Sequence, residues 1–233
     1  MNHKEGQGRM RNTDQGEKKR DYISLPPATM LNPAPVVLIG CADRSRPENR
    51  NLVTAAWAGT VNSEPPMVSV SLRKERYSHG LVAESGEFTV NLVDEGLCRA
   101  ADFCGVRSGR DVDKARELGL QYRPAEGLET APALDGAPVS LSCRVKQVIP
   151  LGSHDLFLGE VKAVQVRGDL VDERGGVHLE RARLVAYNHG LYQRLGDVMG
   201  FFGWSVARKE IFEKRMAQYR GKETRKAQRL PRR

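Results

Sequence analysis

Runs of β-branched and alternating residues recur along this chain, and they constrain its fold more than any other feature. Six such runs predict strands, at residues 36–40, 52–61, 67–72, 88–93, 139–149 and 156–166. Only residues 150–155 separate the last two runs, a spacing typical of a β-hairpin. Residues 177–179 and 184–187 predict two further edge strands.

Helical patterns are fewer and do not alternate regularly with the strands. Ser78 is predicted to cap a short helix that ends at Gly86. Residues 95–103 and 111–118 also have helical spacing, and Gly119 ends the second of these helices. A doubly wound parallel sheet requires regular alternation, so this order argues against that fold. We predict a mostly β protein, an antiparallel barrel with inserted helices and a Pro/Gly/Ala-rich loop over 124–138.

The 233 residues carry a formal net charge of +8, which first suggests a polyanionic partner. This charge is unevenly distributed. Residues 205–233 contain eleven basic and three acidic side chains, whereas residues 22–204 contain 20 basic and 22 acidic ones. We therefore predict a disordered leader over 1–21, one folded domain over 22–204 and a basic, partly helical tail over 205–233. Any binding of nucleic acid is expected to reside in that tail.

The sequence lacks the signatures of several classes of protein. No apolar run approaches the roughly 20 residues of a membrane helix, and the polar residues 1–20 do not resemble a secretory signal. The four cysteines, at positions 41, 98, 104 and 143, have no CxxC spacing. They indicate reduced, mostly buried thiols of a cytoplasmic protein and no metal site. Rossmann, P-loop and HExxH motifs are also absent from the sequence.

Residues 51–57 form the first segment that suits a ligand. Ala55 and Ala56 allow a flat molecule to approach the backbone closely, and Thr54 and main-chain N–H groups offer hydrogen bonds to it. A plain strand with Trp57 in the core is the alternative interpretation.

Residues 69–79 suggest a phosphate site. In an extended segment Ser69, Ser71 and Arg73 share one face. Their hydroxyls and guanidinium, together with a helix N-terminus near Ser78, suit a phosphate. A solvated basic turn explains the same residues equally well.

Two further segments each contain one polar residue of interest. Asn91 lies in an apolar run and must find hydrogen-bond partners if it is buried. His154 lies in the hairpin linker, where it could lean over a ligand as a donor or acid. A satisfied structural asparagine and a surface histidine are the alternatives.

Taken in order, these segments resemble the flavin reductase-like, FMN-binding split-barrel family, and its flavoredoxin branch in particular. The matching pieces are NLVTAAW (51–57), SLR (71–73), YSH (77–79), EFTVN (87–91), ADFCG (101–105), DK (113–114) and SHDLFLGEV (153–161). They cover roughly residues 35–166, with a weaker echo at 187–196. Ser153 stands where many relatives have Asp, and Ala115 where many have Phe.

The resemblance implies a homodimer of antiparallel, Greek-key-like split β-barrels with one FMN per subunit near the dimer interface. It carries the following residues to the cofactor: Asn51, Thr54, Ala55, Ala56 and Trp57 along the isoalloxazine ring, Ser71, Arg73, Tyr77 and Ser78 at the ribityl chain and phosphate, and Asn91, Phe103 and Lys114 in further matching segments. His154 is expected on the nicotinamide side.

A flavin supplies hydride and electron chemistry itself, which accounts for the absence of a nucleophile or catalytic triad. The resemblance therefore implies an FMN-dependent oxidoreductase. NAD(P)H would reduce the flavin, which would pass electrons to free flavin, a protein partner or a small acceptor. A flavoredoxin-type carrier with little direct NAD(P)H oxidation is the alternative. Nucleic-acid binding through 205–233 is a third hypothesis, disfavoured because the tail lacks regularly interleaved aromatic residues.

Overall fold

The computed structural model describes residues 22–227, with side chains described through residue 219. The chain divides into two units, residues 1–30 and 31–233. In the first unit, the described residues 22–30 are exposed and contain no helix or strand. The predicted disordered leader over 1–21 lies outside the described residues, as do residues 228–233 of the basic tail.

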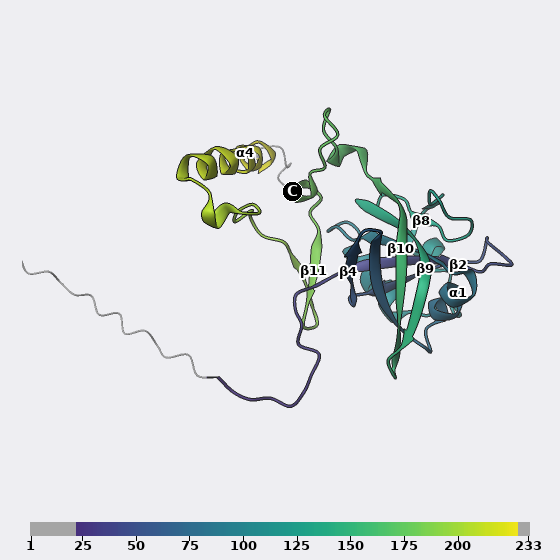
Figure 1. Cartoon of the computed structure of the whole chain (residues 1–233). Coiled ribbons are helices and arrows are strands. Elements are labelled where there is room, and N and C mark those ends of the chain that lie inside the picture. Colours follow the sequence, from purple (N-terminus) through teal and green to yellow (C-terminus); the bar gives the residue numbers. More distant parts are fainter. Residues whose placement is uncertain (1–21, 228–233) are drawn as a thin grey trace, which may run out of the picture. The chain divides into compact units, whose positions relative to one another are not determined.

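The second unit is built on a seven-stranded sheet in which all neighbouring strands are antiparallel (Figure 1). The strand order is β3-β2-β6-β9-β10-β5-β4. These strands span Val37–Ala42 (β2), Arg50–Ala55 (β3), Ala58–Ser63 (β4), Pro66–Arg73 (β5), Glu87–Leu92 (β6), Val139–Pro150 (β9) and His154–Val166 (β10). The prediction of a mostly β, antiparallel fold with inserted helices is confirmed.

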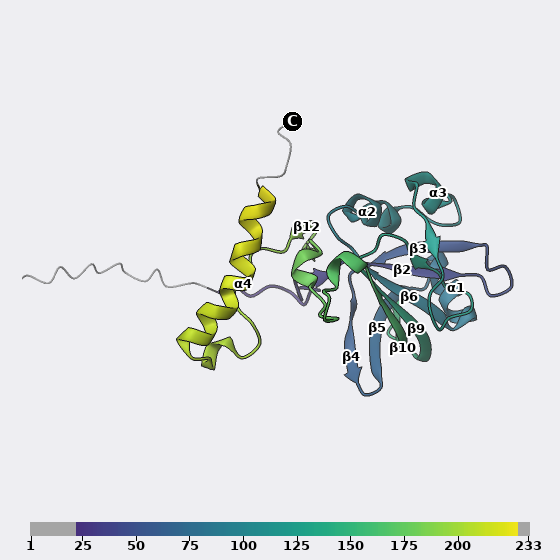
Figure 2. The same cartoon turned by 90° about the horizontal axis from the view of Figure 1, so that it is seen from above.

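Smaller elements surround this sheet. A three-stranded sheet contains β1 (Ala34–Pro35), β11 (Val185–Asn188) and β12 (Leu191–Arg194), and β7 (Tyr122–Arg123) pairs with β8 (Ala133–Leu134). The helices are α1 (Tyr77–Ser85), α2 (Cys98–Val106), α3 (Lys114–Leu118) and α4 (Lys209–Ala227), with 3₁₀ turns at Gly168–Leu170, Leu179–Arg181 and Trp204–Val206. Figure 2 shows α2 and α3 beside β2 and β3, while β4 and β5 extend on the opposite side of the barrel.

Two apolar clusters explain why β2 is buried along its whole length. Ile39 packs with Val70, Phe88 and Phe157 in one cluster, and Leu38 packs with α2 residues in the other. Neighbouring side chains of a strand point to opposite faces, so both faces of β2 are covered. This double burial explains the continuous apolar run at 36–40, where a half-exposed strand would alternate.

The predicted single strand over 52–61 is wrong. The chain leaves the ladder at Ala56 and Trp57, so that β3 and β4 lie at opposite edges of the sheet. The amide of Ser71 donates to the Trp57 carbonyl (2.9 Å), which holds the bend against β5. The bend exposes almost half of the Trp57 side chain (48%), so Trp57 is not the core residue of the alternative interpretation.

The helix ends differ from the predictions in part. Arg76, not Ser78, is the N-cap of α1, and Ser78 lies buried in the first turn. Gly86 and Gly119 end α1 and α3 as predicted, both with positive φ (69° and 64°), a conformation that glycine adopts without a steric penalty. The helices predicted from residues 95 and 111 begin later, at Cys98 and Lys114.

One of the two predicted edge strands is wrong. Residues 184–187 correspond to β11, but residues 177–179 form no strand. Val177 makes only an isolated bridge with Val171. The segment folds back on itself because Asp172 accepts hydrogen bonds from the amides of Arg174 (2.9 Å) and Gly176 (2.8 Å).

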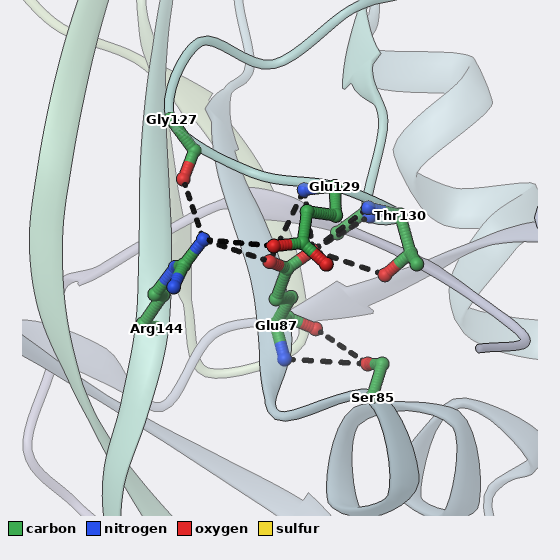
Figure 3. A network of polar contacts seen from close by, with 7 residues as sticks. Ser85, Glu87, Gly127, Glu129, Thr130 and Arg144 are labelled. Carbon is green, nitrogen blue, oxygen red and sulfur yellow. Dashed lines mark hydrogen bonds and ion pairs between the residues drawn. The ribbon is translucent and has the colours of Figure 1, made fainter.

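One carboxylate accepts several hydrogen bonds from the loop between β7 and β8, which lies within the predicted loop 124–138 (Figure 3). Glu87, at the start of β6, accepts hydrogen bonds from the amides of Glu129 (3.0 Å), Thr130 (2.8 Å) and Ala131 (3.3 Å). Arg144 of β9 lies 3.7 Å from the same carboxylate. Burial alone would raise the pKa of Glu87, but these hydrogen bonds outweigh it and hold the pKa below its ordinary value.

The helical spacing predicted in the tail corresponds to α4. Met216 on this helix is buried, and the ring of Phe212 packs against Trp204 (5.7 Å between centroids) and Phe201 (6.2 Å). The guanidinium of Arg215 lies over the Phe201 ring at 4.6 Å. No helix within residues 22–227 is both long and apolar enough to cross a membrane.

Candidate functional site

Two adjoining cavities lie where β3, β5, α1 and the segment around α2 meet. The first, which we call the slot, has a volume of about 440 Å³. The second, which we call the arginine cavity, has a volume of about 530 Å³. Both are lined by Val53, Arg73 and Arg76, so the two cavities are neighbours.

The slot follows the end of β3 and the bend after it. Thr54, Ala55 and Ala56 line it, and the Thr54 hydroxyl donates to the Ala101 carbonyl of α2. Gly105 brings α2 close to β3, because a Cβ at that position would lie 3.4 Å from the Thr54 Cβ. Small side chains along this wall leave room for a flat molecule against the backbone.

Aromatic side chains form other parts of the slot wall. Tyr187 and Tyr192, from β11 and β12, meet edge to face with their ring centroids 5.5 Å apart. The rings of Trp57 and His154 are 4.7 Å apart and tilted by 40°. Flat apolar surfaces on several sides suit an aromatic ligand.

His154 stands at the start of β10, opposite Arg73 of β5 in the ladder. Its Nδ1 atom is within hydrogen-bond distance of the Ser153 hydroxyl (2.9 Å). Burial, and then the charge of Arg73, lower the pKa of His154. The imidazole is therefore neutral at pH 7 and faces the slot.

The arginine cavity is strongly cationic. Its wall contains five basic side chains, Arg73, Arg76, Arg107, Arg110 and Lys114, and two acidic ones, Glu75 and Asp111. Arg73 pairs with Glu75 at 3.3 Å. Among the described residues, the guanidinium groups of Arg76 and Arg107 have no carboxylate within ion-pair distance. Unpaired guanidinium groups in a cavity favour an anionic ligand.

The N-terminus of α1 contributes to the same cavity. Tyr77 and Ser78 line it, and the Tyr77 hydroxyl accepts a hydrogen bond from Asn49 Nδ2 (2.7 Å). The Ser78 hydroxyl accepts from Asn51 Nδ2 (2.7 Å). The free amide groups of a helix N-terminus add to the attraction of an anion.

Lys114 is the buried basic residue of this wall. Its ammonium donates to the carbonyl oxygens of Leu52 (2.7 Å) and Cys104 (2.9 Å), and burial lowers its pKa. Burial also raises the pKa of Cys41 to about 12 and that of Cys104 to about 11, so both thiols are protonated at neutral pH. All four cysteines are free, and Cys98 is only half-buried.

Eleven of the thirteen residues that the resemblance assigned to the cofactor or the nicotinamide line one of the two cavities, and Ser69 of the suggested phosphate site lines neither. The slot contains Thr54, Ala55, Ala56, Trp57, Ser71, Arg73 and His154, and the arginine cavity contains Asn51, Tyr77, Ser78, Lys114 and again Arg73.

Asn91 and Phe103 line neither cavity. Asn91 is fully buried, where it donates to the Leu38 carbonyl (2.9 Å) and accepts from the Leu134 amide (2.9 Å) and the Ser140 hydroxyl (2.7 Å). These contacts correspond to the structural alternative for Asn91. Phe103 is half-buried on α2.

Sequence reasoning missed several lining residues. Arg76, Arg107 and Arg110 line the arginine cavity, and Tyr187 and Tyr192 line the slot. The signals were the basic run between the motifs SLR and YSH, the RSGR sequence that follows ADFCG after one valine, and the weak echo at 187–196.

Comparison with known proteins identifies the fold. The family described as "Flavin reductase like domain" matches residues 29–196. The chain belongs to this family. Flavoredoxin of Desulfovibrio vulgaris (Miyazaki F), a solved structure, superposes with a TM-score of 0.74 at 29% sequence identity, covering 80% of this chain and 100% of that chain. The family's split-barrel fold is thus the fold of this chain, as the resemblance implied.

Relatives in sequence include proteins with and without an assigned activity. A protein of Aeropyrum pernix is 38% identical over 163 residues, which are 67% of this chain and 59% of the relative. A protein of Stutzerimonas stutzeri named FMN reductase (NADH) RutF is 32% identical over 121 residues, 52% of this chain and 67% of that protein. The chain spans only about three fifths of the length of the first curated relatives that it matches (59% and 61%). In the part of the present chain that the structure describes, no cluster of three or more His, Cys, Asp or Glu side chains could hold a metal ion.

Proposed function

We propose that the chain binds FMN and acts as an NAD(P)H-dependent oxidoreductase that passes electrons to free flavin, a protein partner or a small acceptor. One observation carries the proposal: a slot with small and aromatic walls lies next to a cationic cavity, and Arg73 and Arg76 line both. A flavin mononucleotide has the same order of parts, a flat ring, a polar chain and a phosphate.

The residues present fit each part of that cofactor. Ala55 and Ala56 leave the β3 end open to a ring, and Thr54 anchors this wall to α2. In the arginine cavity, the guanidinium group of Arg76 has no carboxylate within ion-pair distance among the described residues, as expected of a group that pairs with the FMN phosphate. Two similarities support the assignment: the Stutzerimonas stutzeri relative named FMN reductase, and a Thermus thermophilus structure named FMN-binding protein (28% identical, TM-score 0.62).

The protein's part in the reaction is to bind and to orient. FMN, when bound, supplies the hydride and electron chemistry. The neutral His154 imidazole offers a hydrogen bond to a nicotinamide or acceptor without placing a positive charge beside it. The Trp57 ring packs against the His154 ring and restricts where that ring can point.

Flavin binding tests the proposal directly. The purified full chain is expected to be yellow, and mass spectrometry of the released small molecule should identify FMN. Titrating the flavin-free chain with FMN and with riboflavin then isolates the phosphate. Arg76→Gln should weaken FMN binding by about tenfold and leave riboflavin binding unchanged. A chain that remains unloaded with excess FMN would refute the proposed function.

A flavoredoxin-type electron carrier is the second candidate, favoured by the similarity to flavoredoxins of Desulfovibrio vulgaris and Methanosarcina acetivorans. Anaerobic stopped-flow mixing separates the two. Rapid bleaching of the bound flavin by NADH or NADPH supports the reductase. Bleaching only by dithionite or by a reduced protein partner supports the carrier.

The remaining expectations are part of the same proposal. We propose a cytoplasmic homodimer, as the family resemblance implies. Light scattering coupled to gel filtration should give twice the chain mass of 25.9 kDa. A monomeric mass for the flavin-loaded chain would contradict the dimer.

A further inference from the structure

The arginine cavity holds more positive charge than one phosphate requires. Its five basic side chains exceed its two acidic ones by three charges. A phosphomonoester carries about −1.5 to −2 charges at pH 7. After neutralising one phosphate, the cavity keeps an excess of about one positive charge.

The basic residues divide into two groups by position. Arg73 and Arg76 also line the slot, so they mark the end of the arginine cavity next to the slot, which we call its inner end. Arg76 immediately precedes α1, which places the N-terminus of that helix at the same end. Lys114 is committed to two backbone carbonyls. Arg107 and Arg110 line the arginine cavity alone and come from the segment that follows α2.

The segment that carries Arg107 and Arg110 is firmly built. Gly109 lies against Asn51, and a Cβ at this position would come within 2.4 Å of Asn51 Oδ1. The Ser108 hydroxyl accepts from the Arg110 amide (3.1 Å). Arg110 donates to the Glu75 carbonyl (3.0 Å) and lies over the Tyr77 ring at 5.6 Å, whereas Arg107 has no ion-pair partner among the described residues.

The size of the arginine cavity, like its charge, exceeds what one phosphate requires. At about 530 Å³ the arginine cavity alone lies within the range of complete ligand pockets, roughly 300–1,000 Å³. Only the chain and phosphate of FMN would enter it if the ring occupies the slot. Space therefore remains beside the inner phosphate, next to Arg107 and Arg110.

We infer that Arg107 and Arg110 form a second phosphate site, which takes a phosphate of an adenine nucleotide beside the FMN phosphate position. This inference rests on the proposed function. The shared chemistry has two possible sources, the adenylate half of FAD or the phosphates of NAD(P)H. Arg107 is the residue that determines the preference, because Arg110 is already held by Glu75 and Tyr77.

Equilibrium titration of the full chain tests the inference. FMN and FAD are titrated into the flavin-free protein by fluorescence, and 2′,5′-ADP and 5′-AMP into the FMN-loaded protein by calorimetry. Arg107→Gln is compared with Arg99→Gln, which removes an exposed arginine on α2 that lines neither cavity. Arg107→Gln should weaken the binding of at least one adenine nucleotide by about tenfold and keep the FMN affinity within about twofold of the wild type. Arg99→Gln should change none of these affinities.

The two sources give different results. If only the binding of FAD is weakened, the second phosphate belongs to the flavin. If only the binding of 2′,5′-ADP or 5′-AMP is weakened, it belongs to the nicotinamide cofactor. The inference is overturned if Arg107→Gln weakens FMN as much as the adenine nucleotides, or if it weakens none of them. Failure of the proposed function is distinguishable, because the wild-type chain would then not bind FMN at all.

Discussion

At the scale of single residues, the low pKa of His154 has a direct consequence for pH dependence. Burial and Arg73 keep the imidazole neutral below its ordinary pKa of about 6.5. Flavin reduction by NAD(P)H should therefore stay constant from pH 8 to about pH 6.5 and fall only in more acid solution, as His154 gains its proton. His154→Gln should remove that acid limb in stopped-flow measurements, and His178→Gln should retain it. An unchanged limb in His154→Gln would assign the titration to another group.

Lys114 illustrates a second residue-scale effect, on stability. The residue is only 3% exposed, and its ammonium donates to two backbone carbonyls. Lys114→Met keeps the length of the side chain but leaves both carbonyls without a donor. We expect the free energy of unfolding in urea to fall by about 3 kcal/mol. Lys209→Met, at an exposed position on α4 (87%), is the control and should change it by less than about 0.5 kcal/mol. Equal effects in the two variants would contradict the role of Lys114.

The sequence indicates residue types well but not their partners. Asn91 and Lys114 are both polar residues in matching segments, and the structure gives both of them backbone partners. Only Lys114 also lines a cavity. The difference depends on which strand or helix covers each residue, and a period-2 or period-3.6 pattern carries no information about that.

At the scale of elements, Glu87 connects β6, β9 and the loop between β7 and β8. Because its folded-state pKa is lowered, the carboxylate stabilises the fold above its unfolded pKa of about 4.3, and this contribution disappears as pH falls through the folded-state pKa. Glu87→Gln should lower the free energy of unfolding in urea by about 2 kcal/mol at pH 7, and this loss should shrink steadily as the pH falls below about 4.3. Glu129→Gln, whose side chain is 80% exposed, is the control. A pH-independent loss would show that the charge does not matter.

The contact between Gly109 and Asn51 joins two elements of the site. Gly109→Ala forces the loop or Asn51 to move, because its Cβ would overlap the Asn51 side chain, which donates to Ser78. FMN binding should weaken by about tenfold in fluorescence titration. Gly80→Ala on α1 is the matched control, since nothing lies within 4 Å of its Cβ. That change should stabilise the helix by about 0.5–1 kcal/mol and leave the FMN affinity unaltered. Normal FMN affinity in Gly109→Ala would refute the coupling.

Element types were more predictable than element ends. Periodicity located the strands of the main sheet, but the 52–61 run concealed the bend at Ala56 and Trp57, because both halves have strand-forming composition. The bend depends on barrel closure, which places β3 and β4 at opposite edges. Serine is a residue type that often caps helices, yet the Ser78 hydroxyl accepts a hydrogen bond from Asn51 of a distant strand.

At the scale of the whole molecule, the order of motifs was more informative than any motif alone. Segments from 51 to 161 are separated by up to about a hundred residues, and antiparallel pairing brings them to two adjoining cavities. The arginines of 107–110 were missed because charge counts over the full chain do not distinguish a cavity wall from a solvated turn. The net charge of +8 therefore had little value for locating the site.

The basic tail is expected to be separable from the flavin site. Both cavities are lined by residues between 36 and 192, and the family match ends at 196. Deleting 205–233 removes eleven basic and three acidic side chains and leaves a nearly neutral domain. Flavin affinity and flavin reduction should stay within about twofold of the full chain, and any salt-sensitive DNA binding should be lost. Anisotropy titrations with labelled duplex DNA at several salt concentrations measure the second effect. Because Phe201 and Trp204 pack on Phe212, a second deletion of 197–233 controls for newly exposed aromatic rings. A shortened chain that still bound DNA with a steep salt dependence would place that activity in the barrel.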